Sequence, residues 1–218
     1  MPERPIQLAV LVSGSGTTLQ NLIDQIDAGR LNAQIRIVVG SRPGLVGLQR
    51  ATKAGLRSEV VDRRAYSNCF EFSRKVFGLC AEAKVDLVCM AGWLCLVDLP
   101  PHFGAKVLNI HPALLPSFGG RGMYGRKVHE AVIAHGCKVS GCTVHFVDSS
   151  YDTGPIVLQR ACPVLEDDTP EELAHRVFEE EKIAYPEAIR LFQAGRLKTD
   201  GRRVHVLPPD TNQWSDQT

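Results

Sequence analysis

The sequence has no excess of charge of either sign and no hydrophobic run long enough to cross a bilayer. Its 25 Lys and Arg residues balance 24 Asp and Glu residues, which leaves a net charge of +1. Proteins that bind nucleic acids or membrane surfaces depend on clustered Lys and Arg, so neither partner is expected. No apolar stretch approaches the ~20 residues of a transmembrane helix, and residues 1–5 lack the pattern of a signal peptide. We therefore expect a soluble, cytoplasmic protein.

The sequence also lacks paired cysteines. Its 7 cysteines are odd in number and scattered, and no two of them form a C-x-x-C pair. A disulfide framework, a zinc knuckle and any other metal site are therefore not expected. Several cysteines lie in apolar stretches, as Cys89 does between Val88 and Met90. Such positions are typical of small buried thiols in a reducing compartment.

Strand and helix patterns alternate through the first half of the chain. Ile6–Val12 is a nearly continuous apolar run, which is typical of a strand buried on both faces. Further elements are predicted in the order helix 17–28, strand 35–39, helix 45–54, strand 59–61, helix 69–83, strand 85–90 and strand 106–110. This order predicts an α/β, Rossmann-like, doubly wound and mostly parallel sheet with helices on both faces. Residues 1–207 are expected to form a single domain and residues 208–218 a flexible tail.

The strand–helix alternation stops after His111. Residues 111–125 are rich in Pro and Gly and predict a long functional loop. A short helix at 127–134 and strands at 142–147 and 156–163 are predicted next. Thr169 then supplies an N-cap, Pro170 a first-turn proline and Glu172 a capping-box acid. The helix that they begin is expected to stop or kink at Pro186.

A glycine-rich segment, Ser-Gly-Ser-Gly-Thr-Thr at residues 13–18, joins the first strand to the first helix. It has no Lys for a Walker A loop, and Leu19 stands where a dinucleotide-binding loop needs its third glycine. The free N–H groups and positive dipole of the helix start instead suit a single phosphate group. A plain glycine-rich turn with a hydroxyl cap explains the same residues equally well.

Asn109 and His111 end the fifth strand, and strand alternation points both side chains the same way. They stand at the carboxyl end of a parallel sheet, where ligands bind in such folds. An amide and a protonated imidazole can both donate to a carbonyl oxygen that gains charge, so the pair suits acyl transfer. Asp152, in a later polar loop, would favour the imidazolium if it lay near His111. An ordinary strand-end turn and a turn-forming Asp are the alternative interpretations.

The other histidines carry weaker signals. His129 and His135 are six residues apart, whereas the helical zinc motif has its histidines at i and i+4. Both are expected to be solvent or loop residues. His145 lies in an alternating strand and is expected to be structural. Trp93, at a strand end, either lines a pocket or caps the core.

Four segments together resemble the folate-dependent formyltransferases. They are Val12–Gln20, Met90–Trp93, Asn109–Pro116, and Thr143–Val147 with the Asp152–Ile156 segment that follows. The Asn-Ile-His-Pro block with its spaced Asp-x-Gly-Pro carries the family resemblance, and the Ser-Gly-x-Gly loop is similar to the phosphoribosylglycinamide formyltransferase branch. The resemblance extends from residue 9 to about residue 197. It implies that the cosubstrate 10-formyltetrahydrofolate donates its formyl group to the amine of glycinamide ribonucleotide in purine biosynthesis.

The resemblance also implies roles for individual residues. Asn109, His111 and Asp152 would be catalytic, with Asp152 holding His111 protonated while the amine attacks the formyl carbon directly. The residues implied to bind substrate are Gly16, Thr17 and Thr18, for the phosphate, and Glu181. Those implied to bind the folate are Leu94, Cys95, Leu96, Val97, Asn109, Asp148 and Asp152.

The sequence departs from the family at several places. Leu94–Val97 replaces a frequent Met-Arg-Ile-Leu, and the loop Phe118–Gly125 is longer than in some members. The Arg that the family uses for the acidic tail of the folate aligns near Asn68 or Cys69, and Arg63 or Arg64 could replace it. The sequence does not choose between them.

Three other functions share parts of this pattern. A deformylase would release formate from the same folate, and it usually carries an extra N-terminal regulatory domain, which this sequence is not expected to have. A formyltransferase for initiator tRNA would need a basic extension. A non-catalytic phosphate-binding module would not need Asn109, His111 and Asp152 together. A monomer and a homodimer fit the sequence equally well.

Overall fold

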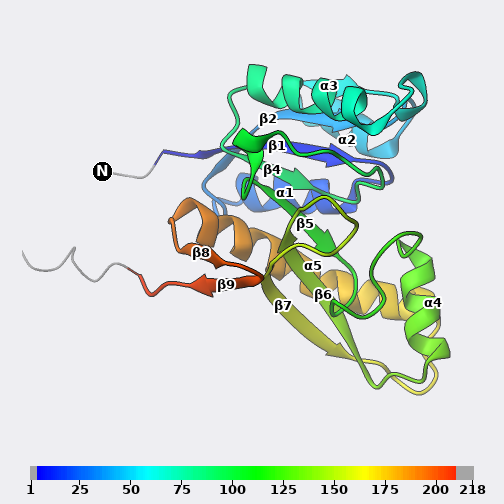
Figure 1. Cartoon of the computed structure of the whole chain (residues 1–218). Coiled ribbons are helices and arrows are strands. Elements are labelled where there is room, and N and C mark those ends of the chain that lie inside the picture. The colour runs from blue at the N-terminus through cyan, green and yellow to red at the C-terminus, as the bar shows by residue number, and fades with distance from the viewer. Residues whose placement is uncertain (1–3, 210–218) are drawn as a thin grey trace, which may run out of the picture.

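A computed structural model describes residues 4–209 of the chain (Figure 1). Its strands are β1 (Ile6–Val12), β2 (Ala33–Gly40), β3 (Ser58–Val60), β4 (Leu87–Met90), β5 (Val107–His111), β6 (Val139–Phe146), β7 (Ile156–Pro163), β8 (Leu197–Asp200) and β9 (Arg203–Val206). Its helices are α1 (Thr17–Asp27), α2 (Val46–Lys53), α3 (Cys69–Glu82), α4 (Arg126–Ala134) and α5 (Pro170–Gln193), with short 3-10 helices at Arg63–Ala65 and Pro101–Phe103.

The strands form one sheet in the order β3-β2-β1-β4-β5-β6-β7-β9-β8. The pairs from β3 to β5 are parallel, whereas β6 is antiparallel to both β5 and β7. The prediction of a mostly parallel, doubly wound sheet is confirmed. The strand order reverses between β1 and β4, and the carboxyl ends of strands at such a switch point form the usual ligand crevice. The glycine-rich loop after β1 and the segment after β4 both end there.

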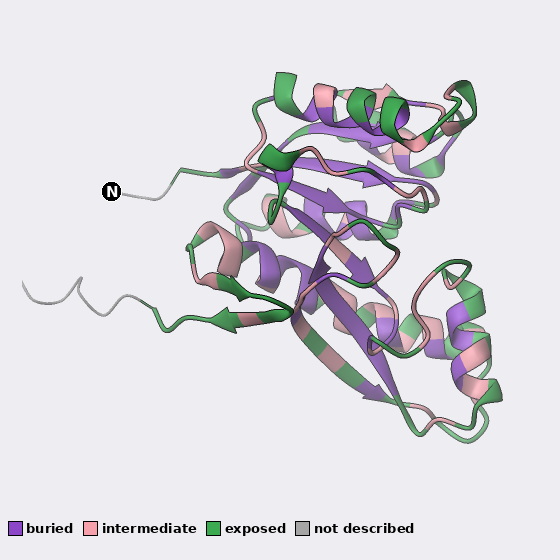
Figure 2. Cartoon of the chain, viewed as in Figure 1, coloured by how far each residue is buried: buried purple, intermediate pink, exposed green. Residues whose placement is uncertain are grey.

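Both faces of the sheet are buried, as the apolar run of β1 predicts. Leu8 and Val10 pack in one cluster with residues of α1 and α5, whereas Ala9 and Leu11 pack on the other face with residues of α3. This alternation is the period of two expected of a strand. Figure 2 shows the central strands buried along their length and the helices exposed on their outer sides. The helices therefore cover both faces, and the functional groups gather at the sheet edge where the strands end.

Helix α5 begins where the sequence predicts, but it extends beyond its predicted end. Thr169 and Glu172 form the reciprocal capping box with Pro170 in the first turn. Pro186 does not stop the helix, because α5 runs through it to Gln193. A proline cannot bond to the carbonyl four residues earlier, which here belongs to Lys182. That carbonyl accepts a hydrogen bond from Asn21 Nδ2 of α1 at 3.3 Å instead, so the neighbouring helix supplies the missing donor.

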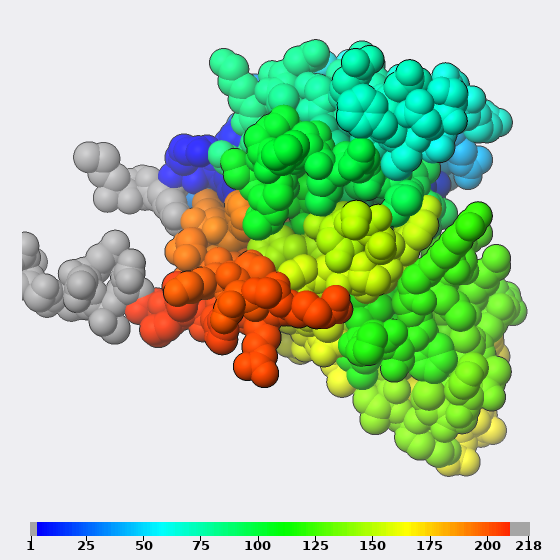
Figure 3. All heavy atoms as spheres, in the orientation of Figure 1, coloured from blue at the N-terminus to red at the C-terminus, as the bar shows by residue number. Residues whose placement is uncertain are grey.

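The β8–β9 hairpin is an element that the sequence patterns did not predict. Its strands are short and mostly exposed, so they carry almost no apolar alternation. Gly201, with φ 56°, makes the turn between them. Figure 3 shows the hairpin, orange to red, on the surface at the edge of the sheet. Of the predicted flexible tail, residues 208 and 209 are exposed and without regular structure, and the rest lies outside the described residues.

Two further properties concern the fold as a whole. No helix within residues 4–209 has the length and hydrophobicity to cross a membrane. The cysteines are free thiols, and burial raises the pKa of Cys80, Cys89 and Cys142 to about 12. These thiols are packing groups rather than nucleophiles.

Candidate active site

The glycine-rich loop presents the start of α1 to the crevice. Gly16 is the N-cap of α1 with φ 71°, and no side chain of the described residues caps that end. A Cβ atom at Gly16 would lie 2.5 Å from Gly47 Cα, so glycine is needed there for packing against α2 as well as for the turn. Ser13 Oγ accepts a hydrogen bond from Leu94 N at 3.0 Å. This bond fastens the loop to the segment that follows β4.

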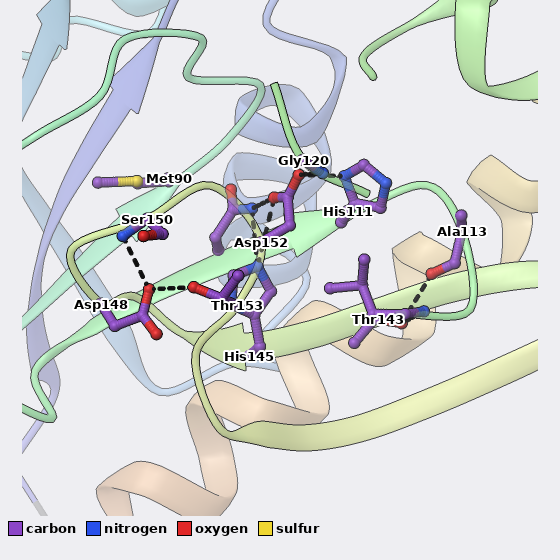
Figure 4. Close-up of polar contacts among 12 residues, drawn as sticks. Met90, His111, Ala113, Gly120, Thr143, His145, Asp148, Ser150, Asp152 and Thr153 are labelled. Carbon is purple, nitrogen blue, oxygen red and sulfur yellow. Dashed lines mark hydrogen bonds and ion pairs between the residues drawn. The ribbon is translucent and has the colours of Figure 1, made fainter. Parts of the chain in front are cut away.

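The structure brings together the three residues expected to be catalytic. Asn109 and His111 belong to the last residues of β5. Figure 4 shows Asp152, from the 147–155 loop, beside His111. His111 Nδ1 lies 3.5 Å from Asp152 Oδ2, and Asn109 Nδ2 donates to Asp152 Oδ1 at 3.4 Å. Asp152 also has the left-handed backbone of a turn, with φ 57°. The interpretation of Asp152 as a turn residue is therefore confirmed, and its catalytic role stays a prediction.

Asp152 is an ionised carboxylate held by several donors. Gly120 N donates to its Oδ2 at 2.9 Å. Burial alone would raise its pKa, but contacts with His145, His111 and Gly120 lower the pKa below its ordinary value. The carboxylate is only 11% exposed, so its charge acts on its neighbours with little screening by water.

His111 has a lowered pKa in spite of this neighbour. Its side chain is 4% exposed, and burial lowers the pKa more than Asp152 and the Phe118 carbonyl raise it. Asp152 thus raises the pKa of His111 as expected, but burial outweighs it, and the expectation that Asp152 keeps His111 protonated stays a prediction. Phe118 O, which can only accept, lies 2.8 Å from His111 Nε2, so Nε2 carries the proton of the neutral ring. Nδ1, which faces Asp152, is the open position for a second proton.

His145 belongs to the same group of polar side chains. Its Nδ1 lies 2.8 Å from Phe146 O, so Nδ1 carries the proton. Its Nε2 then accepts from Asn109 Nδ2 at 3.0 Å, which fixes the direction of the amide. The structural role expected of His145 is thus a specific one, since it positions Asn109. Strand alternation indicated a structural residue, but only the antiparallel register between β5 and β6 places it opposite Asn109.

A cavity of about 510 Å³ lies beside these residues. Thr17 and Thr18 of α1 and Glu181 of α5 line it, together with Asn109, His111 and Asp152, whereas Gly16 shapes the loop without lining the cavity. Burial raises the pKa of Glu181 to about 7, against the opposing effect of its hydrogen bond with Thr18. Glu181 is therefore an acid that changes charge near neutral pH and faces the N-terminal turn of α1.

A second, smaller cavity of about 40 Å³ shares Asn109 and Asp152 with the first, because both residues line both cavities. Cys95, Leu96, Val97 and Asp148 line the smaller cavity, whereas Leu94 lines the larger one. The Asp148 carboxylate accepts from Ser150 N at 3.0 Å and from Thr153 Oγ1 at 2.7 Å, as Figure 4 shows. It thereby braces the loop that carries Asp152.

His129 is not the solvent or loop residue that the sequence predicts. It is buried on the inner face of α4, 4% exposed, and lines the larger cavity. Its Nδ1 has no hydrogen-bond partner within residues 4–209. The packing of α4 against α5 decides this, because Val128 and Val132 of the same helix face are buried with it. His135 is exposed, as expected, and lies at the end of α4.

Trp93 has both roles that the sequence allowed, since it packs on the core and lines a pocket. Its ring stacks on Phe72 of the core at 5.8 Å between centroids. It also lines both cavities.

The structure shows which partners already engage the residues considered for binding the acidic tail of the folate. Arg64 pairs with Asp62 at 2.8 Å, Arg63 donates to the Tyr66 carbonyl at 2.9 Å, and Asn68 Oδ1 accepts from Glu71 N as the N-cap of α3. These residues, with their partners, are engaged in local structure. A cleft of about 530 Å³ next to Leu96 and Val97 contains Asn68, Cys69 and the exposed Arg74.

The part of the chain that the structure describes contains no group of three or more His, Cys, Asp or Glu side chains placed to hold a metal ion.

Comparison with known proteins gives a consistent result. Residues 6–189 match the model of the family described as formyl transferase. The chain is 39% identical to a chloroplastic phosphoribosylglycinamide formyltransferase of Arabidopsis thaliana, over 88% of this chain and 67% of that protein. It is similarly 39% identical to the trifunctional purine biosynthetic protein adenosine-3 of Gallus gallus, over 88% of this chain. The chain spans only about a fifth, 19%, of that relative's length.

The fold is also shared with solved structures. The chain superposes on glycinamide ribonucleotide transformylase 1 from Symbiobacterium toebii with a TM-score of 0.86 and 43% sequence identity. The match covers 94% of this chain and 95% of that one.

Proposed function

The chain belongs to the formyl transferase family, and from this premise we propose that it transfers the formyl group of 10-formyltetrahydrofolate to the amine of glycinamide ribonucleotide, a step of purine biosynthesis. One observation carries the proposal: Asn109 and Asp152 form the common wall of two cavities, with His111 beside them. A ribonucleotide in the larger cavity and a folate whose formyl group reaches the smaller one would meet at the groups that can stabilise an acyl-transfer intermediate.

The larger cavity suits the ribonucleotide. The uncapped N-terminus of α1, with Thr17 and Thr18, offers N–H and hydroxyl donors to its phosphate. Glu181 faces the same space and would contact the polar part of the substrate. Gly16 contributes by letting the loop pass close to Gly47. The amine then extends toward His111 and Asp152.

The folate would lie against Leu94–Val97 and the 147–155 loop, where Asp148 braces Asp152. The cleft beyond Leu96 and Val97 would receive its acidic tail. Arg74 is the exposed cation in that cleft, and we propose it as the partner of the tail in place of Arg63, Arg64 or Asn68.

The reaction forms a bond from the amine nitrogen to the formyl carbon and breaks the bond from that carbon to the folate nitrogen. Asn109 Nδ2 exchanges its 3.4 Å contact with Asp152 Oδ1 for the oxygen of the tetrahedral intermediate and donates to that oxygen. The proton released by the amine reaches His111 Nδ1, where Asp152 at 3.5 Å stabilises the imidazolium. The same proton then passes to the leaving folate nitrogen, so no proton is gained or lost.

One assay distinguishes this function from its rivals. The purified protein is given the formyl folate with and without glycinamide ribonucleotide, and both tetrahydrofolate and formate are measured. We expect tetrahydrofolate only when the ribonucleotide is present, with no formate. Equal turnover without the ribonucleotide, with formate released, would identify a deformylase. Turnover that required aminoacylated initiator tRNA would identify a tRNA formyltransferase, and binding without turnover would identify a non-catalytic module.

We also propose that the protein acts in the cytoplasm as a monomer or homodimer, with small molecules as its only substrates. The +1 net charge supports the absence of a nucleic-acid partner. The Arabidopsis relative is a chloroplastic protein, so fractionation of the source cells is the test of location. Light scattering coupled to size-exclusion chromatography measures the oligomeric state.

A further inference from the structure

We infer that Arg121, in the loop between β5 and α4, binds the phosphate of the ribonucleotide and so sets the preference for a phosphorylated substrate. This inference rests on the proposed function and adds a residue to it. Neither the catalytic group nor the glycine-rich loop includes this side chain.

The charges around the larger cavity call for such a residue. Asp152 and Glu181 both line the cavity, and a phosphate ester brings a further charge of about −1.5 to −2. The N-terminus of α1 offers only about half a positive charge in return. Among the described residues that line the cavity, Arg121 is the only Lys or Arg. Without it, a dianionic substrate would enter a space lined by two acids and no permanent cation.

The guanidinium of Arg121 is available for this contact. It is exposed and has no ion pair or hydrogen bond within residues 4–209. Two cations that follow it are already engaged: Arg126 pairs with Glu130 and Glu171, and Lys127 lies 5.0 Å from the centre of the Tyr124 ring. Arg121 is therefore the cation of this segment left open for a ligand.

The backbone of the loop is anchored to the catalytic residues. Gly120 N donates to Asp152 at 2.9 Å, and the Phe118 carbonyl accepts from His111 at 2.8 Å. Arg121 follows Gly120 directly, so its main chain is held at the rim of the cavity. Gly120 and Gly122 have φ values of 93° and 90°, a conformation that glycine adopts without strain. A long side chain on this anchored turn can close over a bound phosphate.

Arginine suits a phosphate because its planar guanidinium donates two parallel hydrogen bonds to phosphate oxygens. The carboxylates of the folate are the competing ligand. We favour the phosphate because Arg121 lines the same cavity as Thr17 and Thr18, whereas Cys95–Val97 line the other cavity. The cleft beyond them has its own cation in Arg74.

The experiment compares wild type with Arg121→Met on two acceptors, glycinamide ribonucleotide and the same molecule without its phosphate. For the ribonucleotide we expect kcat/KM to fall about 10- to 100-fold in the variant, which is the loss typical of a charge-assisted hydrogen-bond pair. For the dephosphorylated acceptor we expect less than about a twofold change, since the interaction is absent there. The KM for the folate should stay at its wild-type value, and Arg121→Lys should retain part of the preference.

Arg126→Met is the matched control, because it removes one positive charge from the same segment at a position outside the cavity. Its activity on both acceptors should equal that of wild type. The affinity for inorganic phosphate, measured by titration calorimetry, tests the contact directly. It should be weaker in Arg121→Met than in wild type and unchanged in Arg126→Met.

Three outcomes would overturn the inference. Equal losses on both acceptors would show that Arg121 does not contact the phosphate. A raised KM for the folate alone would assign Arg121 to the cosubstrate. Unchanged kinetics and phosphate binding would leave the side chain without a role. In each case the wild-type enzyme still formylates the ribonucleotide, whereas failure of the proposed function would appear as wild-type protein without ribonucleotide-dependent turnover.

Discussion

Asp152→Asn tests the central electrostatic contact of the site. The substitution removes the negative charge that lies 3.5 Å from His111 Nδ1 and keeps an oxygen that can accept from Gly120 N. At that distance and an effective dielectric constant of about 20, the carboxylate attracts an imidazolium by ~5 kcal/mol. This energy corresponds to about three and a half pKa units. Because burial already lowers the pKa of His111, the variant should form the imidazolium only with difficulty.

We expect kcat to fall by about 10²–10³-fold, with small changes in either KM. The sign of the pH effect follows from the proton-accepting role of neutral His111. Loss of the carboxylate lowers the pKa of His111 further, so the acidic limb of the kcat/KM profile should move to lower pH. Glu181, with a pKa of about 7, also changes charge within the measured pH profile, so the profile is repeated with Glu181→Gln in both proteins.

The assay is steady-state formyl transfer in wild type, Asp152→Asn, His111→Ala and the double variant. If the two residues act as a unit, the double variant should be little slower than the slower single variant. Asp148→Asn is the control on the same loop, and it should affect the folate KM more than kcat. Losses that multiply would refute the coupling between Asp152 and His111. Wild-type rates in His111→Ala would refute the mechanism itself.

Three further predictions concern neighbouring residues. His145→Phe should lower kcat about tenfold with both KM values unchanged, because Asn109 loses the acceptor that directs its amide; a change in KM instead would assign His145 to binding. Glu181→Gln should be more stable than wild type by up to ~3 kcal/mol above pH 7 but not at pH 4.5, since a raised carboxyl pKa makes folding less favourable as pH rises from the unfolded to the folded value. Urea titrations at both pH values measure the difference in the free energy of unfolding between the variant and wild type. A difference that does not depend on pH would contradict the raised pKa of Glu181. Tyr185→Phe should lower the free energy of unfolding by about 1–3 kcal/mol, because the buried carbonyls of Met90 and Leu108 lose their hydroxyl partner; wild-type stability in the same urea assay would refute this.

The sequence alone was sufficient to predict the features that depend on residues close together in the chain. Alternation along one strand places Asn109 and His111 on the same side, whatever the rest of the fold does. The capping box of Thr169 and Glu172 joins residues three positions apart. The apolar run of β1 requires burial on both faces. The family resemblance then joined Asp152 to this group, and the structure places it there.

The tertiary structure decided what depends on contacts between distant parts of the chain. Pro186 is accommodated within α5 because Asn21 of α1 bonds to the carbonyl that the proline leaves free. The antiparallel register of β6 places His145 against Asn109, and the packing of α4 turns His129 into the cavity. The protonation of His111 is a balance between burial and the charge of Asp152. A sequence names both groups, but only the fold determines how much water is removed from them and how far apart they lie, and those two quantities set the balance.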